Sequence, residues 1–120
     1  MSSRNIMDLT CECQDCYIKF REAMTTAGLD FAVICTLRSQ KEQDILYAQG
    51  RTTPGKIVTW THNSKHTTGQ AFDIEIIVNG KGTWQVDPYY IRAGEIAKTC
   101  GLYWGGAWYD NDHFQCVPKG

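Results

Sequence analysis

The sequence contains no apolar segment long enough to cross a membrane. Its longest mostly apolar run, Leu29 to Leu37, is far shorter than the roughly 20 residues that a membrane-spanning helix needs. The residues that follow Met1 also lack the apolar stretch of a signal peptide. We therefore expect a chain that is made and kept in the cytosol and does not insert into membranes.

A surplus of positive charge is missing as well. The 12 basic residues are balanced by 13 acidic residues, which gives a net charge of −1. Proteins that bind nucleic acids concentrate basic residues on one face, so we predict no nucleic-acid partner. The sequence also lacks a phosphate-binding loop and a GxGxxG motif, the common signatures of nucleotide binding.

What remains is the composition of one small globular domain. Hydrophobic residues make up 42% of the 120 residues and charged residues 21%, as in ordinary soluble domains. This length suffices for one domain with its own core and is too short for two. We predict a single domain that spans residues 1–120 and acts as a monomer.

Cysteine is abundant, with six residues at positions 11, 13, 16, 35, 100 and 116. Without a signal peptide, reduced thiols are the simplest interpretation. Cys11, Cys13 and Cys16 could bind a structural metal ion if one of the other three cysteines supplied a fourth ligand. The alternatives are small half-buried residues at the start of a helix, or a disulfide that forms when the protein is isolated.

Hydrophobic periodicity predicts three helices, at about residues 13–27, 40–49 and 88–100. Ser39 and Asp87 are suitable N-caps for the second and third helix. The first ten residues are expected to form a loosely ordered lead-in.

Short β-branched or alternating runs predict strands at 31–37, 71–78, 102–104 and 113–117, with a short extended piece at 57–60. The Asn79-Gly80 turn predicts a hairpin partner through Trp84 and Val86. The predicted fold class is α+β, a small and mostly antiparallel sheet flanked by about three helices.

One aspartate lies inside the most regular predicted strand. Phe72, Ile74 and Ile76 alternate on one face of residues 71–78, which places Asp73 on the other face. A carboxylate in the middle of a strand is costly unless water, a partner or a metal ion compensates its charge. The strand alone favours a solvent-exposed face as the explanation.

Two of the three histidines favour metal binding over solvent exposure as the explanation for Asp73. His66 lies in the loop that leads into the strand, and Gly69 lets the backbone bend so that the imidazole and the Asp73 carboxylate can converge. His113 begins the last predicted strand, three residues after Asp110. Two imidazoles, one carboxylate ligand and a second carboxylate as a base form the inventory of a hydrolytic zinc site.

Asp110 is the better candidate for the general base. A tight turn over residues 110–113 would bring its carboxylate near the metal ion without ligating it, where a base can take a proton from water. Asp112 is the rival, but it is adjacent to His113 and would point to the other side in an extended chain.

Other chemistries explain the sequence less well. His62 and His66 have the i, i+4 spacing of an HExxH motif, but Asn63 follows His62 and the surroundings do not favour a helix, so we exclude His62 as a ligand. No cysteine lies in the setting of a nucleophile, such as a glycine-rich turn. A carboxylate pair for glycoside hydrolysis, Asp73 and Asp110, would leave the histidines unexplained.

Three motifs in the chain resemble those of a known family. The run SKHTTGQAFD at Ser64–Asp73 resembles the SxHxxGxAxD signature of the M15 metallopeptidases, and DNDHF at Asp110–Phe114 resembles their second motif. Upstream, TLRSQKEQ at Thr36–Gln43 resembles the family's GxRSxxxQ stretch, and Leu46–Thr52 continues it as in phage endolysins. The resemblance covers nearly the whole chain, and the three motifs occur in the family's order.

This resemblance implies the fold of the D-Ala-D-Ala carboxypeptidases and Hedgehog-like domains, with Zn²⁺ as the cofactor. Zinc would be bound by His66, Asp73 and His113. Asp110 would be the catalytic base and acid, and Arg38 would hold and polarise the substrate carbonyl as a catalytic and substrate-binding residue.

Gln43 and Ser64 match further motif positions, and the resemblance implies that they bind substrate. The chain departs from the family's pattern at two positions. Asp110 stands where many members have the longer glutamate, and Thr36 stands where many have glycine.

The implied function is that of a zinc-dependent metallopeptidase that hydrolyses the stem peptide of bacterial peptidoglycan. The chain is most similar to phage or prophage endolysins that cleave the L-Ala–D-Glu bond, which would wait in the host cytoplasm before release to the cell wall. The alternative within the family is a D-alanyl-D-alanine carboxypeptidase. A further alternative is a zinc-containing domain that binds the wall without catalysis, but a structural site would need neither Asp110 nor Arg38.

Overall fold

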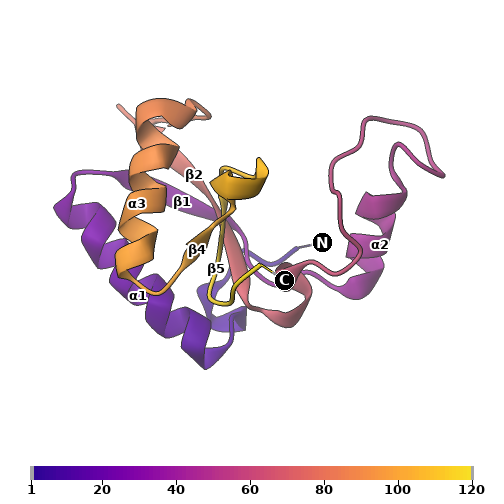
Figure 1. Cartoon of the computed structure of the whole chain (residues 1–120), viewed down its shortest axis with the longest axis horizontal. Coiled ribbons are helices and arrows are strands. Elements are labelled where there is room, and N and C mark those ends of the chain that lie inside the picture. The colour runs from indigo at the N-terminus through magenta and orange to yellow at the C-terminus, as the bar shows by residue number, and fades with distance from the viewer. Residues whose placement is uncertain (1, 120) are drawn as a thin grey trace.

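A small antiparallel sheet lies at the centre of the computed structural model, which describes residues 2–119 (Figure 1). Within these residues, four strands lie side by side in the order β1 (Asp30–Cys35), β2 (Ala71–Val78), β5 (His113–Gln115) and β4 (Tyr103–Trp104). A fifth, β3 (Lys81–Thr83), pairs with the C-terminal half of β2. The long strand β2 therefore has partners on both of its edges.

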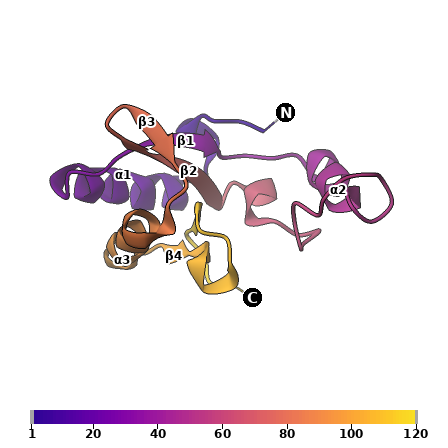
Figure 2. The same cartoon turned by 90° about the horizontal axis from the view of Figure 1, so that it is seen from above.

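Three α-helices accompany the sheet in the described part of the chain: α1 (Cys11–Thr26), α2 (Gln40–Ala48) and α3 (Ile91–Thr99). Helices α1 and α3 lie side by side, whereas α2 stands apart at the opposite end of the molecule (Figures 1 and 2). The side chains of Thr10 and Ser39 accept hydrogen bonds from the first turns of α1 and α2. Each such cap stabilises its helix by about 1 kcal/mol.

The core lies between the sheet and the pair α1 and α3. Phe20 of α1 packs against Phe72 of β2 and Phe114 of β5, with ring centroids 5.8 and 5.0 Å away. Ile74 and Ile76 of β2 are fully buried beside them. Burial of each of these large side chains contributes roughly 1.5–3 kcal/mol, and this apolar layer fixes which face of β2 points inward.

The predicted α+β class, its three helices and its antiparallel sheet are confirmed, and the segment expected as a short extended piece at residues 57–60 pairs with no strand. Side chains hold this segment instead of a neighbouring strand. Arg51 donates a hydrogen bond to the carbonyl of Thr59 (3.0 Å), and Gln43 donates one to the carbonyl of Thr61 (2.7 Å). The backbone is therefore satisfied without a ladder.

The predicted hairpin exists, but its second strand is displaced. Asn79-Gly80 adopts the left-handed φ values of a two-residue turn, 52° and 77°, so Val78 pairs directly with Lys81. Strand β3 therefore ends before the predicted Trp84 and Val86.

The third helix and the last strand are shorter than predicted. Asp87 has an extended backbone with φ −103° and ψ 121°, and a π-helical turn at Val86–Tyr90 leads into α3, which begins at Ile91. Strand β5 ends at Gln115, two residues before the predicted end.

The N-terminal segment is ordered, contrary to the prediction of a loose lead-in. Ser3 exchanges backbone hydrogen bonds with Thr36 and Leu37, directly after β1 (2.7 and 2.8 Å). A 3₁₀ turn follows at Ile6–Asp8, and Leu9 is buried in the core. Backbone pairing and one anchored apolar residue explain the order of this segment.

The cysteines near the N-terminus do not form a metal clamp. Among the described residues, only Cys35, His66 and Asp73 bring three ligand atoms within 4.8 Å of one another. Cys13 is fully buried, and its burial and its neighbour Cys116 raise the pKa of its thiol. None of the six cysteines forms a disulfide in this structure, and within the cluster Cys13 is buried, Cys16 is half-buried and Cys11 is exposed.

We predict that Tyr90→Phe destabilises the fold. The buried Tyr90 hydroxyl accepts a hydrogen bond from the backbone N–H of Ile76 (3.0 Å) and donates one to the carbonyl of Thr83 (2.7 Å). Its removal leaves both buried groups without that partner and should cost about 1–3 kcal/mol of unfolding free energy. Urea denaturation measures the loss, and the half-exposed Tyr103→Phe is the control. An equal effect of both changes would contradict the prediction.

Candidate metal centre

The pairing of β2 with β5 creates the first half of the site. Asp73 of β2 lies directly opposite His113 of β5, while Phe72 and Phe114 form the next pair. Because side chains alternate, the two rings face the core and the carboxylate and imidazole share the other face. The prediction that Asp73 faces away from the core is confirmed by the burial of its neighbours.

A turn over residues 110–113 delivers His113 to its strand. The N–H of Asp110 donates to the carbonyl of Gly105 (2.9 Å), and the N–H of His113 donates to the carbonyl of Asp110 (3.3 Å). A Cβ atom on Gly105 would lie 2.3 Å from that Asp110 carbonyl oxygen. Glycine at this position therefore allows the turn to pack closely. The general-base prediction for Asp110 depends on such a tight turn.

His66 comes from a 3₁₀ turn, Lys65–Thr68, that precedes β2. The Ser64 hydroxyl accepts a hydrogen bond from the N–H of His66 (3.2 Å) and caps the turn. Gly69 ends it with a left-handed φ of 71°, as expected from its position between His66 and Asp73. Ser64 thus shapes the loop, and its predicted contact with substrate stays a prediction.

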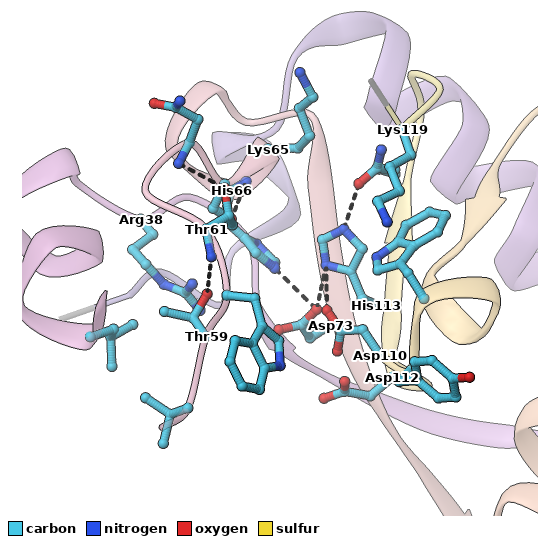
Figure 3. Close-up of a pocket in the computed structure, with 18 residues that line it drawn as sticks. Arg38, Thr59, Thr61, Lys65, His66, Asp73, Asp110, Asp112, His113 and Lys119 are labelled. Carbon is cyan, nitrogen blue, oxygen red and sulfur yellow. Dashed lines mark hydrogen bonds and ion pairs between the residues drawn. The ribbon is translucent and has the colours of Figure 1, made fainter. Parts of the chain in front are cut away.

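The two imidazoles meet at one carboxylate oxygen (Figure 3). His66 Nε2 lies 3.0 Å and His113 Nδ1 lies 3.2 Å from Oδ1 of Asp73. Each ring is also held at its other nitrogen, His66 Nδ1 by the carbonyl of Thr36 (2.8 Å) and His113 Nε2 by Oε1 of Gln115 (2.7 Å). Both imidazoles are at least 94% buried, so the geometry is fixed from both sides.

The pKa values of His66 and Asp73 are shifted strongly by their contacts with each other and with their neighbours. Burial opposes the charged form of His66, but hydrogen bonds with Asp73 and Cys35 outweigh it and raise the pKa to about 10. Burial also opposes the ionised form of Asp73, but hydrogen bonds from His113 and His66 hold its pKa well below the ordinary range. Two imidazole nitrogens converge on one carboxylate oxygen, and this donor set fits a divalent metal ion.

Cys35 is the neighbour that sequence reasoning missed, and it competes with His113 as the third ligand. Its Sγ contacts His66 at Nδ1 (3.5 Å), the nitrogen that also bonds Thr36, and it accepts a hydrogen bond from Arg38 (3.3 Å). His113 instead contacts the same Asp73 oxygen as His66 Nε2. His66, Asp73 and His113 therefore form the candidate ligand set, with Cys35 beside it.

Cys35 also has some features of a nucleophile. Burial opposes its thiolate, but the hydrogen bond with His66 outweighs burial and lowers the pKa of the thiol. However, its side chain is only 5% exposed and is absent from the lining of the cavity at the site. Only its cross-strand position opposite Asp73 reveals it, and strand pairing is invisible in the sequence.

Two carboxylates face the candidate metal centre. Asp110 Oδ2 lies 3.8 Å from His113 Nδ1, and about half of its side chain is exposed. Asp112 lines the same cavity, so the expectation that it points away is wrong, because the chain turns at this point instead of being extended. Burial, the charge of Asp73 and a hydrogen bond to Asp110 raise the pKa of Asp112 to about 7.

The centre lies in a cavity of about 880 Å³ whose walls come from distant parts of the chain. Arg38 and Lys119 lie on opposite sides of the centre (Figure 3), and Trp60, Lys65 and Tyr109 also line the cavity. The Trp60 and Tyr109 side chains are 80% and 98% exposed. Aromatic and cationic groups around a polar floor are suited to an extended, anionic ligand.

Arg38 is held in place by its neighbours. Its Nη1 donates to Oε1 of Gln43 (2.8 Å), and its Nε donates to the hydroxyl of Ser2 (3.2 Å). Gln43 is fully buried and also bonds Thr61. Gln43 does not line the cavity, so this structure gives it a positioning role toward Arg38, and direct substrate contact is unsupported.

His62 lies apart from the centre. It is exposed, and its ring packs against that of Tyr47 at a tilt of 32°, with centroids 3.5 Å apart. This position agrees with its exclusion as a ligand.

Comparisons with known proteins identify the family. The model of an M15 peptidase family, described as D-alanyl-D-alanine carboxypeptidase, matches residues 58–116. The peptidoglycan L-alanyl-D-glutamate endopeptidase CwlK of Bacillus subtilis (strain 168) is 36% identical in an alignment that covers 82% of this chain and 68% of CwlK. The chain belongs to the M15 metallopeptidase family. The family match contains His66, Asp73, Asp110 and His113, whereas Arg38 lies outside it.

Solved structures share the fold of this M15 chain. The L-Ala D-Glu endopeptidase ChiX of Serratia marcescens superimposes with a TM-score of 0.75 over 98% of this chain and 89% of ChiX, at 23% identity. The LD-carboxypeptidase LdcB superimposes with a TM-score of 0.70 over 89% of this chain and 58% of LdcB, at 18% identity. The predicted D-Ala-D-Ala carboxypeptidase-like fold is confirmed.

We predict a pH-dependent stability of the metal-free chain. Because the pKa of His66 is raised, its imidazolium stabilises the fold fully below about pH 6.5, and this contribution is lost as the pH rises toward about 10. The difference in unfolding free energy between wild type and His66→Gln should therefore shrink over that interval, as measured by urea denaturation with a chelator present. An unchanged difference at both ends would contradict the prediction.

Proposed function

We propose that the chain is a zinc-dependent endopeptidase that cleaves the L-alanyl-D-glutamate bond of peptidoglycan stem peptides. One observation carries the proposal. His66 Nε2 and His113 Nδ1 converge on one oxygen of Asp73 at an open cavity, with the Asp110 carboxylate 3.8 Å from His113. Three ligands and a nearby base are what metal-assisted hydrolysis requires.

The substrate assignment is supported by the 36% identity to CwlK, which is a peptidoglycan L-alanyl-D-glutamate endopeptidase. The shape and charge of the cavity agree with it. A stem peptide is extended and carries carboxylates, and Lys65, Lys119 and Arg38 line the cavity. Such cations can bind carboxylates through charge-assisted hydrogen bonds.

Each residue of the site would have a separate role in hydrolysis. His66, Asp73 and His113 would hold the zinc ion, which would supply Lewis-acid polarisation of the scissile carbonyl and lower the pKa of water to about 7. Asp110 accepts the proton of the attacking water and returns it to the leaving amine. Arg38, held by its neighbours, donates hydrogen bonds to the oxygen on which negative charge develops.

The biological role that we propose is that of a phage or prophage endolysin. This role is supported by the resemblance of Leu46–Thr52 to the corresponding run of phage endolysins. The enzyme would be held in the host cytoplasm and released to the wall. Expression in the cytoplasm alone should then leave cells intact, whereas forced export should lyse them.

The released ends of digested muropeptides test the scissile bond. We expect mass spectrometry to find a new free amine on D-Glu, and chelation with EDTA should abolish its appearance. The family description as D-alanyl-D-alanine carboxypeptidase provides the alternative. Release of free D-Ala without the D-Glu amine would favour that alternative and contradict the endopeptidase assignment.

Variants of two carboxylates test the base. Asp110→Asn should lower kcat by about 10²–10⁴-fold, because proton transfer is lost, and should leave zinc content near one per chain. Asp112→Asn should have a smaller effect, and the exposed, distant Asp87→Asn is the matched control. A larger loss in Asp112→Asn than in Asp110→Asn would reverse the assignment.

Removal of a ligand should act differently from removal of the base. His66→Ala or His113→Ala deletes one of only three protein ligands, so bound zinc should fall well below one per chain after dialysis. Atomic absorption or mass spectrometry under native conditions measures the metal. Retention of a full equivalent of zinc by either variant would refute the ligand set.

A further inference from the structure

One buried side chain beside the metal centre has no part in the chemistry described above. Gln115 lies on β5 two residues after His113, so both side chains are on the same face of the strand. It is only 4% exposed. Sequence alternation alone places Gln115 near the site, but it gives no reason for an amide there.

Hydrogen bonds determine how the amide is oriented. The Nε2 group of Gln115 donates to the carbonyl of Val117 (2.9 Å), which leaves the amide oxygen toward His113 Nε2 at 2.7 Å. An amide oxygen can only accept a hydrogen bond, so His113 Nε2 must carry the proton. In a neutral imidazole, the free electron pair is then on Nδ1, the nitrogen that faces Asp73 (3.2 Å).

The other imidazole has the same arrangement with the nitrogens exchanged. His66 Nδ1 is held by the backbone carbonyl of Thr36 at 2.8 Å, and Nε2 faces Asp73. Each ring therefore has a hydrogen-bond acceptor at one nitrogen, which leaves the other nitrogen toward Asp73, although Cys35 Sγ also contacts His66 Nδ1 (3.5 Å). One acceptor is main chain and cannot be removed by substitution, whereas the other is the side chain of Gln115.

We propose that Gln115 is a positioning residue that holds His113 in the Nε2–H tautomer and so keeps Nδ1 available to the metal ion. The inference rests on the proposed zinc function. Its consequence is that Gln115 sets zinc affinity through the orientation and basicity of His113. The effect therefore precedes catalysis and is measurable without peptidoglycan.

Two nearly isosteric variants separate this role from a structural one. Gln115→Met and Gln115→Glu both lose the N–H that bonds Val117, but only glutamate keeps an acceptor for His113 Nε2–H. We expect Gln115→Met to weaken zinc binding by about 10–100-fold, and Gln115→Glu to bind at least as tightly as wild type. Competition with a chelator of known affinity measures binding, and the exposed Gln85→Met is the matched control.

The relative zinc affinities of Gln115→Met and Gln115→Glu test the positioning role of Gln115. Equal weakening in Gln115→Met and Gln115→Glu would show that only the bond to Val117 matters and would overturn the proposal. Wild-type affinity in Gln115→Met would overturn it as well. A wild-type chain that binds no zinc would overturn both this proposal and the proposed function, whereas normal wild-type binding confines any failure to the role of Gln115.

A measurement on the wild-type protein needs no variant to fold. In ¹H–¹⁵N spectra of the zinc-loaded chain, we expect His113 Nε2 to appear as a protonated nitrogen and Nδ1 as the metal-bound one. His66 should show the opposite assignment and serves as an internal reference. A proton on Nδ1 of His113, or the metal ion on its Nε2, would overturn the proposal.

Discussion

The register between β2 and β5 is the constraint on which the rest of the molecule depends. It pairs Phe72 with Phe114 on the core face and Asp73 with His113 on the opposite face. The same pairing therefore buries two aromatic rings against α1 and sets a carboxylate beside an imidazole. A slip of one residue would expose the rings and bury the polar pair. The free energy of core packing thereby specifies the geometry of the metal centre.

The side chains of the candidate metal centre are held by hydrogen bonds from the protein itself. Asp73 lies between two imidazoles, and each imidazole is fixed at its far nitrogen, His66 by the carbonyl of Thr36 and His113 by Gln115. Buried polar groups are costly unless they are hydrogen-bonded. Here every ring nitrogen has a partner, so the fold tolerates a buried, charged cluster.

The walls of the cavity have a different construction from its floor. The floor is built on paired strands, whereas Arg38 follows β1 and the segment around Trp60 is irregular. Gln43 connects these two parts, because it bonds both the Arg38 guanidinium and the carbonyl of Thr61. A rigid floor that carries the ligands and walls that are built from loops agree with an enzyme whose chemistry is fixed and whose substrate contacts are adaptable.

The sequence by itself determined the α+β class, the inward and outward faces of β2, and the convergence of His66 with Asp73. These features follow from periodicity and from a glycine bend between neighbouring residues, which are local properties of the chain. Only the tertiary structure decided that residues 57–60 form no strand, that Gln43 supports Arg38 from a buried position, and that Asp112 faces the cavity. Each of these depends on hydrogen bonds or turns that join the segment to distant residues, and sequence spacing carries no record of such contacts.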